Sequence, residues 1–150
     1  MIASVVRERK NGNYATYIHN RYINYSNICI LSCQFCAFAA KKRDAPRIRI
    51  CDRRNYSGRE GCAPLGVTEV HMVGGLHPTL KKEWYMELLQ RLRALDPKLH
   101  IKAFTAIEVR HLAQRIFRMP IRDTLETLRA VGLGSITGGG AGDFRSCCPR

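Results

Sequence analysis

The residues with the most distinctive chemistry in this chain are three closely spaced cysteines, Cys29, Cys33 and Cys36, in the spacing C-x3-C-x2-C. Cysteine thiolate is the usual protein ligand of iron–sulfur clusters, and three thiolates on one short loop can hold three irons of a cubane 4Fe-4S cluster. The fourth iron then has no protein ligand from this loop, so a small molecule can bind it. The spacing therefore predicts a cluster with one open iron.

A structural zinc site is the alternative interpretation of the same residues. Cys33 and Cys36 alone have zinc-knuckle spacing, and Cys51, Cys62 or His19 could complete a set of four ligands. Zinc sites usually use two spaced ligand pairs, and no second C-x2-C or H-x3-H pair follows. The triplet as a whole therefore favours the cluster over zinc.

The cysteines follow a segment, residues 17–27, that is rich in tyrosine and isoleucine and whose alternation predicts a strand. Three later segments predict further strands: 67–73, 99–104 and 134–137. Between them, residues 83–95 have apolar side chains at three- and four-residue steps and an i,i+4 pair of Glu87 with Arg91, as expected of an amphipathic helix. Residues 107–117 and a segment beginning near Pro120 and ending at Gly132 also predict helices.

This alternation predicts an α/β fold. Strands and helices joined by short loops form parallel βαβ units, which wind right-handed. Strands that are each followed by a loop with functional residues suit a β/α barrel of the TIM type, whose sites collect at the C-terminal ends of the strands. We therefore expect a partial, truncated barrel of parallel strands with the cysteines at that end.

Composition limits the class of protein. The chain has 150 residues, seven cysteines and a formal net charge of +13. Residues 1–20 contain no apolar run of the kind found in a signal peptide, and no segment approaches the ~18 apolar residues of a membrane span. Cysteines without a secretory signal indicate a reducing cytoplasm and metal binding, so we expect no membrane partner.

Four motifs together resemble one family. They are NRYINYSNIC at 20–29, TEVHMVGGLHP at 68–78, IKAFTAIE at 101–108 and GLGSITGGGA at 132–141. In this order and at these barrel-like intervals they resemble aminofutalosine synthase, a radical S-adenosylmethionine (SAM) enzyme of the futalosine route to menaquinone. The resemblance covers roughly residues 5–42 and 66–141. The sister enzyme dehypoxanthine futalosine cyclase shares the lead-in to the first cysteine, but the second and third motifs look more like the synthase.

The resemblance implies a reaction. A reductant such as flavodoxin or ferredoxin would reduce the 4Fe-4S cluster, and the cluster would cleave SAM. The resulting 5′-deoxyadenosyl radical would add to the vinyl double bond of 3-[(1-carboxyvinyl)oxy]benzoate, and rearrangement with loss of the carboxyl group would give aminofutalosine. SAM is thus a co-substrate, and no nucleic acid takes part.

The resemblance also implies roles for single residues. Cys29, Cys33 and Cys36 would be the cluster ligands, and Phe35 would pack near the adenine of SAM. Gly74 and Gly75 would approach the SAM amino group through their backbone, or form an ordinary turn. Glu108 would accept from the ribose hydroxyls, or simply be a carboxylate at a helix N-terminus. His77 is a weak candidate for a catalytic contact with the substrate carboxylate, and a loop histidine without a role is its alternative. The glycines at 138–140 could accept an anion or form a flexible turn.

Two segments depart from the family pattern. Residues 45–64 replace a crossover helix with a stretch that has prolines, glycines and no helical period, and residues 142–150 replace an acidic-apolar continuation. Both are rich in arginine and cysteine, which suggests shifted reading frames and explains part of the positive charge. We accordingly expect a remnant of an N-terminal helical segment at 1–16, a partial radical SAM barrel at 17–141 with an aberrant insert at 45–64, and an aberrant tail at 142–150.

Two other functional classes stay open at this point. One is an inactive product of the same family, because strands that complete the barrel would be absent. The other is a basic zinc-binding module for nucleic acid, which the net charge of +13 suggests. Against that module, the basic residues lack interleaved aromatics, and the strand and helix order is not that of a zinc ribbon.

Overall fold

The computed structural model describes residues 2–34, 36–41 and 66–138. In these residues three parallel strands form one sheet in the order β1-β2-β3, with β1 at Asn20–Asn24, β2 at Glu69–Val73 and β3 at His100–Ala103. The register pairs Ile23 with Met72, and Met72 with Ala103. The expected α/β architecture with parallel strands is thus confirmed, although each strand is shorter than its sequence pattern predicted.

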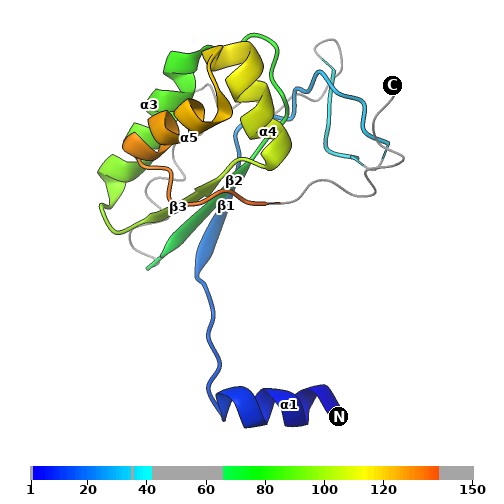
Figure 1. Cartoon of the computed structure of the whole chain (residues 1–150), viewed down its shortest axis with the longest axis vertical. Coiled ribbons are helices and arrows are strands. Elements are labelled where there is room, and N and C mark those ends of the chain that lie inside the picture. The colour runs from blue at the N-terminus through cyan, green and yellow to red at the C-terminus, as the bar shows by residue number, and fades with distance from the viewer. Residues whose placement is uncertain (1, 35, 42–65, 139–150) are drawn as a thin grey trace.

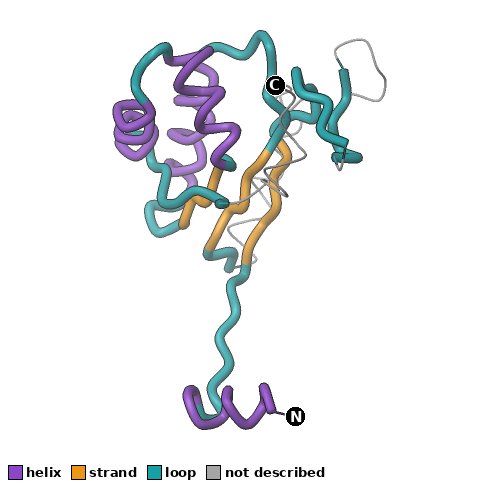
Figure 2. Tube along the Cα trace, turned by 45° about the vertical axis from the view of Figure 1, so that its right-hand side comes forward, coloured by secondary structure: helices purple, strands orange, loops and turns teal. Residues whose placement is uncertain are grey.

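Helices lie on one face of this sheet (Figures 1 and 2). Helix α3 spans Lys82–Leu95, as the periodicity of this segment predicted, and its Glu87 and Arg91 form the expected ion pair. Its apolar side packs on the strands and buries Tyr85, Leu88, Leu89 and Leu92. The sheet contributes Val70, Met72, Ile101 and Ala103, all essentially buried, to the same core. The core therefore lies between the sheet and the helices that cover it, α3 among them.

After β3 the chain forms a helix whose hydrogen-bond pattern changes from α to π along its length. Helix α4 spans Ala106–His111 and continues directly as a π-helix, η2, at Leu112–Phe117. Arg118, in the left-handed region at φ 54°, ends it. A single α-helix over 107–117 was predicted, so the change of register is new. It buries Phe117, whose ring lies 5.1 Å from the Nζ atom of Lys82 on α3.

Helix α5 spans Ile121–Ala130, with Pro120 before its first turn and Gly132 just beyond its end at φ +116°. This matches the predicted start and stop. The predicted fourth strand at 134–137 is present only as isolated parallel bridges, Lys102 with Ser135 and Thr105 with Gly138. The chain therefore continues beside β3, but within the described residues it does not extend the sheet as a strand.

Helix α1, Ile2–Asn11, stands away from the sheet at the end of an extended segment (Figure 1). None of its residues is buried. Gly12, at φ +58°, closes it, and its N–H donates to the carbonyl of Glu8. The predicted insert at 45–64 and tail at 142–150 lie outside the described residues.

One backbone feature at the end of β3 is unusual. Phe104 is fully buried and has φ 65°, a region that a bulky side chain rarely occupies. Its N–H donates to the Met72 carbonyl at 3.0 Å, and its own carbonyl accepts from the Thr137 N–H at 2.9 Å. These two bonds hold the turn that leads from β3 into α4, and so they position the residues that follow.

Candidate metal and cofactor site

The three cysteines lie on a closed loop at the C-terminal end of β1 (Figure 1). Asn27 and Cys29 pair with Ala40 across the base of this loop. The Ala40 N–H donates to the Asn27 carbonyl at 2.8 Å, and the Cys29 N–H donates to the Ala40 carbonyl at 3.0 Å. The cysteine loop, which we define as residues 29–40, is therefore held shut by backbone bonds at its own ends.

Lys41 secures the first turn of the cysteine loop. Its Nζ atom donates to the Leu31 carbonyl at 2.5 Å and to the Cys29 carbonyl at 3.4 Å. Further along, the Cys36 N–H donates to the Cys33 carbonyl at 3.1 Å and forms a turn. All three cysteine side chains are half-buried, and none of them forms a disulfide. Phe35, the expected adenine contact, lies outside the described residues.

The glycine turn, residues 74–76, follows β2 and lies against this loop. The Gly75 N–H donates to the Ser26 carbonyl at 2.7 Å, and the Ile30 N–H donates to the Leu76 carbonyl at 3.0 Å. The Leu76 N–H is directed at the Cys29 sulfur, with 3.4 Å between nitrogen and sulfur. The loop after β1 and the turn after β2 are therefore one hydrogen-bonded unit.

Both glycines of this turn are required by close contacts within the chain itself. A Cβ atom on Gly74 would lie 2.6 Å from the Tyr25 ring, and one on Gly75 would lie 2.4 Å from the Ile28 carbonyl oxygen. The N–H groups of both glycines are donated to protein acceptors, Glu108 and Ser26. An ammonium group such as the amino group of SAM donates rather than accepts, so at this turn it would have to bind carbonyl oxygens.

Glu108 joins the ends of all three strands. Its Oε1 atom accepts from the Gly74 N–H at 2.9 Å and from the Tyr25 hydroxyl at 2.7 Å. Its Oε2 atom accepts from both the N–H and the hydroxyl of Thr105, each at 2.7 Å. Tyr25 follows β1, Gly74 follows β2 and Thr105 follows β3, so one carboxylate binds donors from each. A ribose contact at Glu108 would have to displace one of these donors.

Burial and the neighbouring Glu108 carboxylate together raise the pKa of Tyr25 well above its ordinary value. Burial is the larger cause, and the charge of Glu108 is the next. The same two causes raise the pKa of Tyr85, which packs edge-on against the Tyr25 ring. Tyr25 therefore stays protonated and keeps donating to Glu108.

His77 is buried just beyond the glycine turn, with 3% of its surface exposed. Its Nδ1 atom accepts from the Thr79 N–H at 3.2 Å, so a neutral ring carries its proton on Nε2. Its carbonyl accepts from His111 Nε2 at 3.3 Å. The structure thus places the weak catalytic candidate inside the protein, next to α4, rather than on an open surface.

Three cysteine thiols on one short loop are the donor type that an iron–sulfur cluster uses. In residues 2–34, 36–41 and 66–138, no three His, Cys, Asp or Glu side chains gather closely enough to bind one ion. Cys51 and Cys62, which the zinc alternative used, lie outside the described residues.

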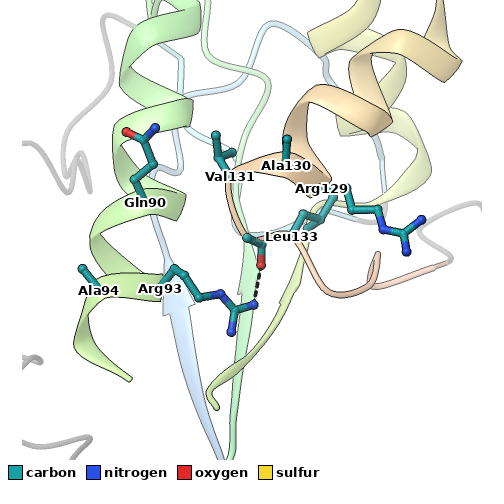
Figure 3. A pocket seen from close by; sticks show the side chains of 8 residues that line it. Gln90, Arg93, Ala94, Arg129, Ala130, Val131 and Leu133 are labelled. Carbon is teal, nitrogen blue, oxygen red and sulfur yellow. Dashed lines mark hydrogen bonds between the residues drawn. The ribbon is translucent and has the colours of Figure 1, made fainter. Parts of the chain in front are cut away.

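A surface hollow lies at the other end of the sheet (Figure 3). The ends of α3 and α5 line it, and Arg93 and Gly132 are among its lining residues. The Arg93 guanidinium donates to the carbonyls of Pro97, Leu99 and Gly132, at 2.8 to 2.9 Å. These bonds tie the segment before β3 and the residue after α5 to the end of α3. The Arg93 side chain is therefore engaged in holding the fold, and the hollow is separate from the cysteine loop.

Sequence reasoning missed several residues that build this site: Tyr25, Ser26, Lys41, Leu76 and Thr105. Only Thr105 had a recognisable signal, because Thr105 and Glu108 have the T-x-x-E spacing of a capping box, which the structure contains in full. The others act through backbone atoms or through packing, which no local pattern indicates.

Similar proteins are enzymes with several different names. The chain is 40% identical over 146 residues to an aminodeoxyfutalosine synthase of Streptomyces coelicolor. This alignment covers 95% of this chain and 37% of the relative. It is 33% identical over 150 residues to the aminodeoxyfutalosine synthase of Thermus thermophilus, with 95% and 38% covered. A cyclic dehypoxanthine futalosine synthase of S. coelicolor is 36% identical over 145 residues, with 93% and 36% covered. No known family model matches the chain.

Solved structures give the same fold. Methylornithine synthase superposes with a TM-score of 0.62 at 22% identity, covering 89% of this chain and 35% of that enzyme. An FeFe-hydrogenase maturase from Carboxydothermus hydrogenoformans superposes with a TM-score of 0.54 at 16% identity, covering 91% and 39%. At these identities the likeness concerns the fold alone, and it identifies the parallel sheet as part of an α/β barrel.

The described part of the chain has the fold of part of an α/β barrel, as in these solved structures. Its sequence is similar to part of the aminodeoxyfutalosine synthases, and it spans less than two fifths of the length of those relatives. None of the helices in the described part of the chain has the length and apolar character needed to cross a membrane.

Proposed function

We propose that this chain is the cluster- and SAM-binding part of an aminofutalosine synthase. The observation that supports this best is the hydrogen-bonded unit formed by the cysteine loop after β1 and the glycine turn after β2. It lies at the C-terminal ends of parallel strands, where barrel enzymes carry their active sites. The 40% identity to an aminodeoxyfutalosine synthase favours that reaction over others of the class.

In this proposal Cys29, Cys33 and Cys36 hold a 4Fe-4S cluster. When bound and reduced, such a cluster would supply the electron for the cleavage of SAM, whose adenosyl group would then be added to the vinyl group of 3-[(1-carboxyvinyl)oxy]benzoate. The protein's own residues position these groups. The closed base of the cysteine loop fixes the thiols. The carbonyl oxygens of Gly74 and Gly75 are hydrogen-bond acceptors, as the SAM amino group requires.

Phe35, Glu108 and His77 are each proposed to have a different role. Phe35 is proposed beside the adenine. Glu108 is buried and bonded within the chain, so its support for SAM binding is indirect, through the position of Gly74. His77 is buried as well, and a role in catalysis would require the substrate to reach the protein interior. A flavodoxin or ferredoxin is the proposed reductant, and the reducing cytoplasm is the proposed location.

Anaerobic reconstitution of the chain with iron and sulfide tests the proposal in three stages. We expect about four irons per chain, the electron paramagnetic resonance (EPR) signal of a reduced 4Fe-4S cluster, and 5′-deoxyadenosine on addition of dithionite and SAM. Mass spectrometry in the presence of the carboxyvinyl-oxybenzoate then looks for aminofutalosine. Zinc in place of iron would contradict the proposal at the first stage.

The Cys33→Ser variant is the matched control, because it removes one proposed iron ligand while keeping the size of the side chain. We expect it to lose most of its iron and all SAM cleavage. If it retained a full cluster, the assignment of the cysteine triplet would be wrong.

A second candidate is the cyclase of the same pathway, favoured by the 36% identity to a cyclic dehypoxanthine futalosine synthase. The two are separated by offering dehypoxanthine futalosine and the carboxyvinyl-oxybenzoate to the same reconstituted protein. Turnover of the first substrate alone would replace the synthase by the cyclase.

A further inference from the structure

The structure connects one of the three cysteines to the glycine turn in a particular way. The Cys29 sulfur accepts two backbone N–H groups, from Leu31 within the cysteine loop and from Leu76 in the glycine turn, each at 3.4 Å. Backbone donors to cluster sulfurs are one of the means by which proteins set the reduction potential of an iron–sulfur cluster. One donor lies in the loop after β1 and the other in the turn after β2, so each hydrogen bond can be removed without the other.

We propose that the glycine turn sets the reduction potential of the cluster through the hydrogen bond from Leu76 N–H to the Cys29 sulfur. The inference rests on the proposed function, because it requires a cluster held by Cys29. It adds a role for residue 76, whose side chain has no cluster chemistry of its own.

The position of the Leu76 N–H is fixed on both sides. Ahead of it, the Gly75 N–H donates to Ser26 at 2.7 Å, and after it the Leu76 carbonyl accepts from Ile30 at 3.0 Å. Leu76 is also buried, with 7% of its surface exposed. The peptides on both sides of the Gly75–Leu76 peptide are thus each held by a hydrogen bond, which restricts the direction of the Leu76 N–H.

Gly75 makes this approach sterically feasible. A Cβ atom at residue 75 would lie 2.4 Å from the Ile28 carbonyl oxygen and 3.1 Å from the Cβ atom of Cys29. Any side chain would therefore separate the turn from the cysteine it contacts. The glycine at 75 is explained by the need for the next N–H to reach the thiol.

The expected effect has a definite sign. A reduced cluster carries one more negative charge than an oxidised one, and an N–H dipole directed at a ligand sulfur stabilises the more negative state. Half-burial of Cys29 keeps water from replacing the lost bond completely. Removing the Leu76 N–H should therefore move the midpoint potential to more negative values.

The test replaces Leu76 by leucic acid, which exchanges the N–H for an ester oxygen and keeps the side chain. The matched control is the same replacement at Leu99, whose N–H donates to Asp96 at 3.1 Å just before β3. Redox titration of both reconstituted proteins, followed by EPR, should show a more negative midpoint for the Leu76 ester and an unchanged midpoint for the Leu99 ester. Equal midpoints at full iron content would overturn the inference.

Iron analysis separates this inference from the proposed function. If no variant binds iron, the proposed function fails, and the bond itself is then tested in the metal-free chain by amide hydrogen exchange. Cys29→Ala should make the Leu76 amide exchange roughly fivefold faster or more, since one hydrogen bond is lost. Cys36→Ala should leave it unchanged. An unchanged Leu76 rate in Cys29→Ala would also overturn the inference.

Discussion

Glu108 shows how much one side chain can organise in a small sheet. Its carboxylate accepts four hydrogen bonds and is buried, with 3% of its surface exposed. A carboxylate is suited to this position because it offers only acceptors to a site that presents only donors. The strand ends that carry the candidate site therefore depend on this residue for their relative positions.

Glu108→Gln should destabilise the protein by about 2–4 kcal/mol, because the amide directs an N–H₂ group at two of those donors and leaves them unpaired. Unfolding by urea, followed by circular dichroism, measures the change. Glu87→Gln is the control, since Glu87 forms an exposed i,i+4 pair with Arg91, worth about 0.5 kcal/mol or less. Similar losses in the two variants would contradict the central role of Glu108.

His111 gives the protein a pH-dependent stability. Burial lowers its pKa, the charge of Arg115 lowers it further, and the His77 carbonyl and Glu108 oppose the shift. The unfolded chain therefore binds a proton at this histidine at a pH where the folded chain does not. Stability should fall as the pH drops below about 6.5, with no contribution from His111 above about 7.

The unfolding free energy of the wild type and of His111→Gln, measured between pH 7.5 and 5, tests this prediction. The variant should lose part of the downward slope on the acidic side. An identical slope in both proteins would show that His111 does not contribute.

Among the elements, the glycine turn differs from an ordinary turn because neither Gly74 nor Gly75 has a positive φ angle. Glycine is needed there for space, since Tyr25 and Ile28 occupy the volume of a side chain. Gly66 is the opposite case, with φ +65° and nothing within 4 Å of the position that a Cβ atom would take.

Gly74→Ala should therefore cost more stability than Gly66→Ala. Overpacking against the buried Tyr25 ring is expected to cost about 3 kcal/mol, whereas the left-handed backbone at Gly66 costs about 1 kcal/mol with alanine. Thermal unfolding of the two variants provides the comparison. A larger loss in Gly66→Ala would mean that backbone conformation, and not space, governs both positions.

The elements that the sequence predicted well are those with a regular apolar period. The apolar residues of α3 recur at helical steps, and Pro120 and Gly132 mark the limits of α5. The π-helix at Leu112–Phe117 could not be predicted, because the π register has no signature in composition. Phe104 is similar: an aromatic residue in a strand pattern gives no sign of its φ of 65°.

The candidate site was predictable in its residue types and less so in its contacts. The cysteine spacing indicated the loop, and the glycine pair indicated a close backbone approach. That approach is to Tyr25 and Ile28 of the same chain, which only the pairing of β1 with β2 brings near. Glu108 was singled out, but its donors come from three separate segments that meet only in the folded sheet.

At the scale of the whole molecule, α1 contributes little to the folded core. All its residues are exposed, and Ile2 has 84% of its surface accessible. Deleting Ile2–Asn11 should change the free energy of unfolding by less than about 0.5 kcal/mol, as for other changes outside the core. Leu88→Ala on α3, a fully buried position, should cost about 2–5 kcal/mol in the same urea titration. A deletion as harmful as Leu88→Ala would show that α1 packs on the protein in solution.

The closure of the cysteine loop also has a consequence for how such a chain can vary. Ala40 pairs with Asn27 and Cys29, and Lys41 reaches back to Leu31, so the base of the loop is closed by residue 41. Residues inserted or removed after Lys41 do not change the number of residues between the thiols or between the paired ends. The base of the loop is thus closed locally, while the glycine turn adds bonds from Leu76, and a change in chain length between Lys41 and β2 leaves that local closure intact.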